Sequence, residues 1–423
     1  MNLKLRLTAM SFLQFFVWGA WLTTIGTYCL NAKGWGFPQF GAIFSTLALS
    51  SLFMPAITGI MADRWVNAER LYGVLHVLYG AILFIVPRVN DPDTLYYVIF
   101  GAMICYMPTI SLANSISYTI LKSNNYDVIK VFPPIRVWGT IGFIAAMWVT
   151  NLTGSKVTSG QFVIAGVAAI GLGIYAFTLP KCPPQNTISR DASLVEQLGL
   201  KAFRLFGNYK MALFFVFSMF LGAALQLTNM YGDSFITSFG EVDAYKDSFV
   251  VKYSTIIISI SQISETVFIL TIPFFLKRFG IKNVMLFSMI AWVLRFGLFA
   301  YGDPSMLGVT FIIISCIVYG MAFDFFNISG SLFVETTTDS SIRSSAQGVF
   351  MMMTNGVGAY LGSKISGWVN ATYFTTVDAE GKFHNDWHGI WLTYAIYALI
   401  VAVLFAIMFR HKHEPEKIGA INH

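Results

Sequence analysis

Long uncharged stretches separated by short charged segments run along the whole chain. Near-continuous hydrophobicity without period-two alternation favours membrane helices over a β-barrel, because helices satisfy their own backbone hydrogen bonds in hydrocarbon. A span needs roughly 20 apolar residues. The pattern therefore predicts an all-α membrane protein with twelve transmembrane helices in two six-helix bundles. The stretches are 7–32, 34–62, 71–87, 94–121, 137–155, 157–180, 211–232, 253–276, 283–302, 304–334, 344–377 and 387–409.

The longest connection without an apolar span lies between 181 and 209 and divides the spans six and six. We expect an N-terminal bundle over 1–180, a cytoplasmic linker over 181–208, a C-terminal bundle over 209–410 and a cytoplasmic tail over 411–423. Apolar residues alternate with charges in 193–206, which predicts an amphipathic interfacial helix. The letters GAWL at 19–22 and GAAL at 222–225 occupy corresponding places in the two halves, as expected of an internal repeat.

Composition excludes a water-soluble globule. The 423 residues are 56% hydrophobic, 16% aromatic and only 11% charged, whereas a soluble domain carries about 25% charge. The net charge of +6 has to be interpreted by position. With a cytoplasmic N-terminus, the inner connections hold 18 Lys and Arg residues and the outer ones hold six. This distribution satisfies the positive-inside rule and places both termini in the cytoplasm. The first apolar stretch is too long for a cleavable signal peptide.

Two carboxylates interrupt apolar spans. Glu265 lies near the middle of the eighth stretch and Asp324 near the middle of the tenth. Ionisable groups inside a membrane are costly and mark functional sites. Two carboxylates at mid-membrane suit the binding and release of a proton. The alternative is a carboxylate paired permanently with a neighbouring helix.

Three cations lie in or beside spans. Arg136 follows Pro133 and Pro134, which mark a helix start or a kink. Thr140 and Phe143 follow Arg136 at i+4 and i+7, so the three share one helix face. This face could offer a charge, a hydroxyl and a ring to a cavity, or Arg136 could extend to the interface. Arg295 and Lys364 lie in the outer parts of their spans, where we expect extension to the interface or a structural pairing.

Amides and aromatic rings gather on the same spans. Amide groups both donate and accept hydrogen bonds, and rings can stack, so together they suit a ligand with a flat base and a polyhydroxyl ring. The same polar groups could instead hold helices together. The residues are Gln226 and Asn229, one turn apart; Gln262, one turn before Glu265; and Tyr319, Phe323, Asp324 and Asn327 in YGMAFDFFNISGS (319–331).

The chain lacks the common motifs of catalysis. It contains no HExxH, no GxSxG, no P-loop and no paired Asp cluster for a metal. We therefore expect a protein that is not an enzyme and that needs no cofactor. The four cysteines form no CxxC or zinc-type spacing, which predicts buried thiols. His76 is the one histidine well inside a span, and a packed role is favoured over a proton relay.

Several sequence blocks resemble a known family. GIMADRW at 59–65, with Asp63 and Arg64 at a helix end, is similar to the loop motif of the major facilitator superfamily. Most of the length resembles the bacterial nucleoside:proton symporters of that superfamily, in the group of nucleoside and xanthosine permeases. The blocks that carry the resemblance are MNLKLRLTAMSFLQFFVWGAWLTTIG, FPPIRVWGTIGF, LGAALQLTNM, SISQISETVFILTIPFFLKRFGIKNVM, YGMAFDFFNISGSLFVE and SAQGVFMMMTNG.

The resemblance implies proton-driven nucleoside uptake through the bacterial inner membrane by a functional monomer. It implies that the substrate is bound by Arg136, Thr140, Phe143, Gln226, Asn229, Gln262, Glu265, Tyr319 and Phe323, and that Asp324 joins Glu265 in proton coupling. Ala224 stands where some members carry an acid. The residues alone leave two alternatives open: a transporter of sugars or other small polar solutes on the same fold, and a membrane nutrient receptor that does not transport.

Overall fold

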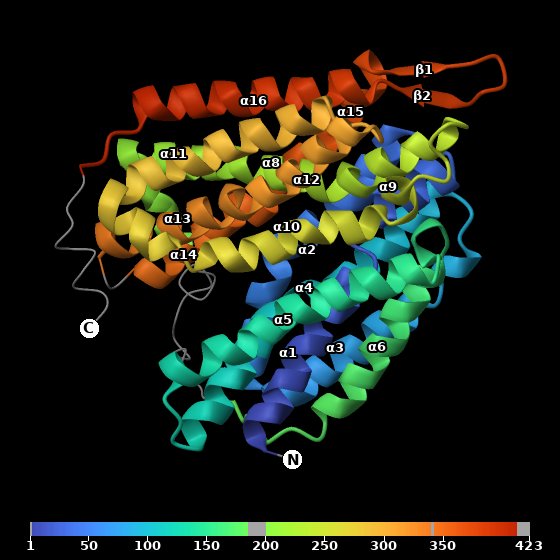
Figure 1. Ribbon diagram of the computed structural model, residues 1–423. Helices are drawn as coiled ribbons and strands as arrows, with labels where there is room; N and C mark the ends of the chain where they lie inside the picture. The colour runs from blue at the N-terminus through green and yellow to red at the C-terminus, as the bar shows by residue number, and fades with distance from the viewer. Residues whose placement is uncertain (1, 185–199, 340–341, 413–423) are drawn as a thin grey trace. The chain divides into compact units, whose positions relative to one another are not determined.

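The structure is a computed structural model, and it describes residues 2–184, 200–339 and 342–412. These residues form two compact units (Figure 1). Unit 1 contains the helices up to α6 together with Asn229–Ser234 of α8, and unit 2 contains the rest of α8 and the elements that follow it, with η4 before it. The predicted domain limits remain a prediction.

Besides its part of α8, the described residues of unit 1 form six α-helices and three short helical segments. Its elements are α1 (Leu3–Gly19), the π-helix η1 (Thr27–Ala32), α2 (Phe37–Arg64), α3 (Ala68–Leu83), η2 (Val86–Arg88), α4 (Pro92–Ser123), α5 (Val128–Leu152), η3 (Ser155–Val157) and α6 (Gly160–Ala176). Polar caps define several helix starts. Asn2 accepts from the Lys4 amide, and Asp91 accepts from the Thr94 amide at 2.7 Å just before Pro92 opens α4.

Glycines allow the helices of unit 1 to approach closely. A side chain at Gly73 would lie 2.9 Å from the carbonyl oxygen of Gly173, and one at Gly80 would lie 2.7 Å from that of Gly166. These pairs bring α3 against α6. On the α1–α5 interface, a side chain at Gly19 would lie 2.5 Å from the carbonyl oxygen of Phe143. Small residues at membrane helix interfaces permit such backbone contact.

Unit 2 is also helical, with a small hairpin. Its elements are η4 (Leu200–Gly207), α8 (Tyr209–Ser238), η5 (Phe239–Glu241), α9 (Phe249–Lys252), α10 (Ser254–Ile269), α11 (Ile272–Ala300), α12 (Met306–Ala322), α13 (Asp324–Thr337), α14 (Arg343–Met351), the π-helix η6 (Met352–Gly358), α15 (Ala359–Tyr373), β1 (Thr375–Val377), β2 (Phe383–Asn385) and α16 (Trp387–Met408). In Figure 1 the hairpin extends beyond the ends of α15 and α16.

Several predicted spans are interrupted helices. The first is broken over residues 20–24, between α1 and the helical turn leading into η1. The tenth is broken at Phe323 between α12 and α13, and the eleventh contains the π-helix η6. α11 joins two helices across Gly280, whose φ of 76° favours glycine. This kink falls in the predicted connection between the eighth and ninth spans.

The membrane prediction is supported in part. Eight helices in the described ranges are long and apolar enough to cross a membrane, and the architecture is that of a mostly helical membrane protein. The span count of twelve stays a prediction. Two boundaries differ from those expected. α15 ends at Tyr373 and β1 follows, because Thr375–Val377 pairs antiparallel with Phe383–Asn385. α5 begins at Val128, so Pro133 and Pro134 lie within the helix.

The predicted amphipathic helix over 193–206 is only partly described. Residues 193–199 lie outside the described residues, whereas 200–206 belong to the 3₁₀-helix η4. The ring of Phe203 stacks on Phe206, whose ring lies 5.0 Å from that of Phe215 on α8. Part of this segment therefore packs on unit 2. Residues 413–423 of the predicted tail also lie outside the described residues.

Candidate functional site

The face of α5 predicted from residue spacing is present in unit 1. Arg136, Thr140 and Phe143 are all half-buried. The Arg136 guanidinium lies over the Phe15 ring of α1, 4.0 Å from its centroid. The Phe143 ring meets Trp18 of α1 edge-on at 6.4 Å. Aromatic residues of α1 therefore hold two of the three side chains in place.

A buried polar network supports this face, and the sequence reasoning missed it. Gln14 of α1 is fully buried; its amide donates to Thr109 at 2.9 Å and accepts from the Tyr72 hydroxyl at 2.6 Å. The Tyr106 hydroxyl donates to the Gln14 carbonyl at 2.8 Å. The signal available in the sequence was an amide side chain in the middle of the first apolar stretch. The network ties α1 to α3 and α4, and so fixes the helix that carries Phe15.

His76 is packed inside unit 1. Its side chain has no exposed surface, and Nδ1 lies 3.1 Å from the carbonyl oxygen of Tyr72, one turn earlier on α3. The ring centroid lies 4.3 Å from that of Tyr72, with the two rings tilted by 49°. This is the packed environment that the sequence favoured.

Two amides predicted on α8 lie one turn apart on a single helix. Gln226 and Asn229 are both half-buried, and the boundary between the two units falls between them. Ala224 is 2% exposed. An acid at that position would face a packed interior, and alanine there leaves the amides Gln226 and Asn229 among the neutral polar groups of this stretch of α8.

α10 carries the second amide and the first carboxylate. Gln262 and Glu265 are half-buried and one turn apart. Ser264, between them, donates to the Ile317 carbonyl of α12 at 2.5 Å. A side chain at Gly320 would lie 2.6 Å from the backbone of Ser264. This tight α10–α12 contact fixes the position of Glu265 relative to α12.

The second carboxylate lies at a helix break. α12 ends at Ala322 and α13 begins at Asp324, so Asp324 occupies the first turn of α13. Asp324 is 5% exposed and Tyr319 is 4% exposed, whereas Phe323 is half-buried. A helix N-terminus favours negative charge. The break therefore gives a carboxylate inside an apolar span a local source of compensation.

Arg295 was expected to extend to the interface or to pair structurally, and the first expectation is wrong. The side chain has no exposed surface. Its guanidinium carbon lies 4.3 Å from the ring centroid of Phe299 and 5.2 Å from that of Tyr319. Tyr319 also lies within electrostatic reach of Glu265 and Asp324. Unit 2 thus gathers two acids, one base and one phenol, which we call the charge cluster. Lys364, in contrast, is exposed.

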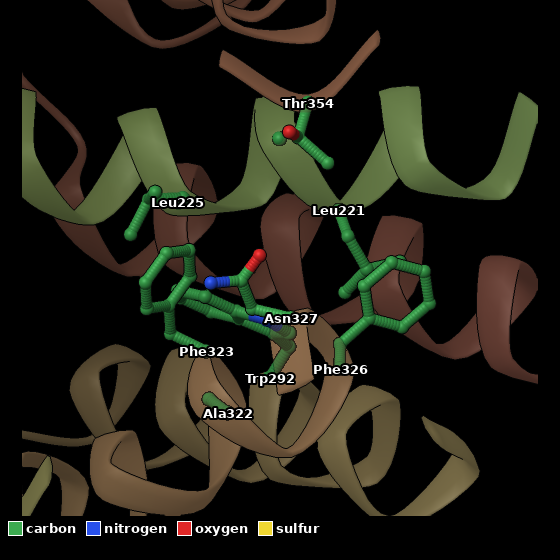
Figure 2. Close-up of a pocket in the computed structure, with 9 residues that line it drawn as sticks. Leu221, Leu225, Trp292, Ala322, Phe323, Phe326, Asn327 and Thr354 are labelled. Carbon is green, nitrogen blue, oxygen red and sulfur yellow. The ribbon is translucent and has the colours of Figure 1, made fainter. Parts of the chain in front are cut away.

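A small pocket in unit 2 borders the predicted residues on α12 and α13. Figure 2 shows the Asn327 amide between the rings of Phe323 and Phe326, with Leu221, Leu225 and Thr354 around it. The free space is about 10 Å³, roughly what one water molecule requires. The pocket is too small for a sugar or a base, so any larger ligand needs other residues as well.

The described ranges contain no group of three or more His, Cys, Asp or Glu residues that could hold a metal ion. The site residues in both units are instead amides, rings, a hydroxyl and isolated charges. This composition suits the recognition of a neutral polar ligand and the movement of a proton.

A family model described as nucleoside H+ symporter matches residues 1–414. The chain belongs to this family. Its members are transporters, so this nucleoside H+ symporter is not an enzyme. The match also favours nucleosides over the sugars that the residue types alone left open.

Relatives of this symporter cover almost its whole length. It is 50% identical over 418 residues to a xanthosine permease of Escherichia coli (strain K12), covering 99% of this chain and 98% of the permease. It is 48% identical over 413 residues to the nucleoside permease NupG of the same organism, covering 98% of this chain and 97% of NupG.

Solved structures agree with the fold of this symporter. A crystal structure of NupG matches with a TM-score of 0.89 at 48% identity, covering 97% of this chain and 100% of that chain. A bacterial homologue of the human lysosomal transporter Spinster matches with a TM-score of 0.69 at 14% identity, covering 96% of each chain. The second likeness concerns the fold alone, which is that of major facilitator transporters.

Proposed function

We propose that this nucleoside H+ symporter imports nucleosides by alternating access across a bacterial inner membrane, as a monomer with twelve spans. The 18 inner and six outer basic residues support cytoplasmic termini. Two interrupted helices support a span count above eight, because α1 joined to η1 and α14 joined to α15 through η6 are each long enough for a further span. Bundles over 1–180 and 209–410 are part of the same proposal.

We propose that both units contribute to nucleoside binding. Unit 1 supplies Arg136, Thr140 and Phe143 from α5 and Asn229 from α8. The other residues, Gln226, Gln262, Glu265, Tyr319 and Phe323, belong to unit 2. The amides suit the donor and acceptor edge of a base, the carboxylate suits ribose hydroxyls, and the rings suit stacking. Their shared half-burial supports a role at a cavity surface; Tyr319, which is buried, is the exception.

The observation that carries proton coupling is the placement of Glu265 and Asp324. Both lie in apolar spans of unit 2, and both lie within electrostatic reach of Tyr319. A carboxylate in such surroundings exchanges a proton when its exposure to water changes. In the proposed cycle, Glu265 or Asp324 is protonated from outside, and the loaded protein then changes from an outward-open to an inward-open state. Loss of the proton to the cytoplasm releases the nucleoside.

The test is uridine and adenosine uptake into membrane vesicles under an imposed pH gradient. The vesicles should accumulate substrate, and this accumulation should stop when a protonophore collapses the gradient. Glu265→Gln and Asp324→Asn should each lower accumulation. Glu335→Gln is the matched control, because Glu335 pairs with Arg343 at 2.8 Å on the partly exposed end of α13.

Undiminished accumulation without a gradient would overturn proton coupling. Normal accumulation by both Glu265→Gln and Asp324→Asn would overturn only the assignment of the coupling carboxylates. Strong competition by hexoses, with no competition by nucleosides, would overturn the substrate class. Binding without any accumulation would favour a receptor.

A further inference from the structure

Arg295 is a buried cation that hydrogen bonding does not compensate. Its side chain has no exposed surface, and Nε, Nη1 and Nη2 have no hydrogen-bond partner among the described residues. The faces of Phe299 and Tyr319 provide cation–π contact. Such contact offsets only part of the free-energy cost of removing a guanidinium from water. Negative charge nearby has to offset the remainder.

The charges that can do so are few. α11 packs against α12, α13 and α16. α12 presents Tyr319, and α13 presents Asp324. α16 contributes His388, which contacts the Ala300 carbonyl at 2.7 Å, and Tyr394, whose ring lies 5.8 Å from Phe296. α10 adds Glu265. Both Glu265 and Arg295 interact electrostatically with Tyr319. Within the predicted spans of unit 2, Asp324 and Glu265 are therefore the two acids that can offset the charge of Arg295.

The backbone holds Arg295 close to this group. The Ser315 hydroxyl of α12 donates to the Arg295 carbonyl at 2.8 Å, and the Ser288 hydroxyl of α11 donates to the Ala322 carbonyl, just before the break. Trp292, one turn before Arg295, meets the Tyr319 ring edge-on at 5.8 Å. The cation is thus positioned against the helix that carries Tyr319 and that ends beside Asp324.

The charge count of the cluster then decides how many protons it takes. One arginine and two ionised carboxylates sum to −1, and a single proton brings the sum to zero. In an apolar environment a neutral group of charges is favoured over a charged one. We propose that Arg295 is the positioning residue that limits the charge cluster to one exchangeable proton, so that one proton moves with each nucleoside. This inference rests on the proposed function.

Neutralising Arg295 should alter coupling more than binding. In Arg295→Gln the two carboxylates sum to −2, so both should hold protons, and the second should not be released at cytoplasmic pH. An opposite charge nearby changes the proton affinity of a carboxyl group by about one to three pH units. We expect gradient-driven accumulation to fall about tenfold, since one pH unit is a factor of ten. The pH dependence of uptake should move about one unit to the alkaline side.

Exchange of internal for external uridine needs no net proton movement, so Arg295→Gln should retain counterflow. Arg295→Lys keeps the charge and should restore accumulation. The decisive variants are Arg295→Gln combined with Glu265→Gln or with Asp324→Asn, because each returns the cluster to −1 with one carboxylate left. At least one of them should recover the pH dependence of the unsubstituted protein. Lys364→Gln is the control for loss of a cation from a span, since Lys364 is exposed.

The experiment uses the full chain in proteoliposomes with labelled uridine, imposed pH gradients and counterflow. Wild-type accumulation and pH dependence in Arg295→Gln would overturn the inference, as would two double variants that perform no better than the single one. If Arg295→Gln shows no counterflow, the lysine variant and the double variants decide the outcome. Failure of the unsubstituted protein to accumulate uridine would instead overturn the proposed function.

Discussion

The stacking of Arg136 on Phe15 leads to a prediction about substrate affinity. Phe15→Ala should weaken uridine affinity by up to about tenfold, because a cation–π contact of about 1 kcal/mol or more orients the guanidinium. The uptake KM and uridine binding by the purified protein measure this effect. Phe279→Ala is the control, since it removes a comparable contact with Arg278 at 5.7 Å in unit 2. Unchanged affinity in Phe15→Ala would contradict a positioning role for the ring.

Residue spacing predicted the shared helix face of Arg136 but not its contacts. The i, i+4, i+7 spacing predicted that Arg136, Thr140 and Phe143 lie on one face of a helix, and all three are half-buried on α5. Their partners on α1 could not be predicted, because contact between helices distant in sequence depends on tertiary packing. For the same reason Arg295 could not be distinguished from an interfacial arginine: the sequence shows its position along the span but not the neighbours that bury it.

At the scale of elements, apolar runs predicted where helices lie but not where they break. The runs at 94–121 and 387–409 correspond closely to α4 and α16. The break at Phe323 and the π-helix η6 have no proline within them, so the strongest helix-breaking residue does not mark either place. The hairpin was missed because three-residue strands at the end of an apolar run carry too little pattern to separate from a helix end.

Close contact between α10 and α12 gives a prediction about stability. Gly320→Ala should destabilise the protein by about 1–3 kcal/mol, because the added carbon would overlap Ser264 and Phe268. Gly297→Ala on α11 should be neutral or stabilising, because nothing lies within 4 Å of the added carbon. Thermal unfolding in detergent measures both. Equal melting temperatures for the two variants would show that α12 can move away from α10 at little cost.

The β1–β2 hairpin gives a prediction about pH. Hydrogen bonding from His384 at 2.8 Å holds the pKa of Asp378 below its ordinary 3.8, and the Glu241 carboxylate at 2.9 Å raises the pKa of Lys382 above 10.5. The Asp378 contribution is therefore present above pH 3.8 and lost as the pH falls through the lowered value. The Lys382 contribution is lost only as the pH rises through its raised value. Hairpin stability should fall in acid.

Hydrogen exchange of the hairpin amides, expressed as protection factors, measures this stability. Protection at 375–377 and 383–385 should decrease below pH 3.8, and Asp378→Asn should decrease it at neutral pH. Asp243→Asn is the control, because Asp243 pairs only locally with Lys246 at 3.3 Å. Acid-insensitive protection of the hairpin would assign its stability to strand pairing alone.

For the whole molecule, charge placement predicts orientation. The excess of basic residues in the inner connections predicts that the tail is cytoplasmic and the hairpin extracytoplasmic. A membrane-impermeant maleimide should label Glu380→Cys in intact cells and Lys412→Cys only after permeabilisation. Both positions are exposed. The reverse labelling pattern would overturn the orientation and, with it, the direction of the proposed cycle.

The labelling experiment depends on the native thiols. Cys29, Cys105, Cys182 and Cys316 are all free and buried, and burial raises the pKa of Cys182 to about 12. Since the thiolate is the reactive form, such a thiol reacts slowly even where reagent can reach it. The four native cysteines can therefore be left in place, because they should contribute little maleimide labelling. Cysteines can then be introduced while every native packing contact is kept.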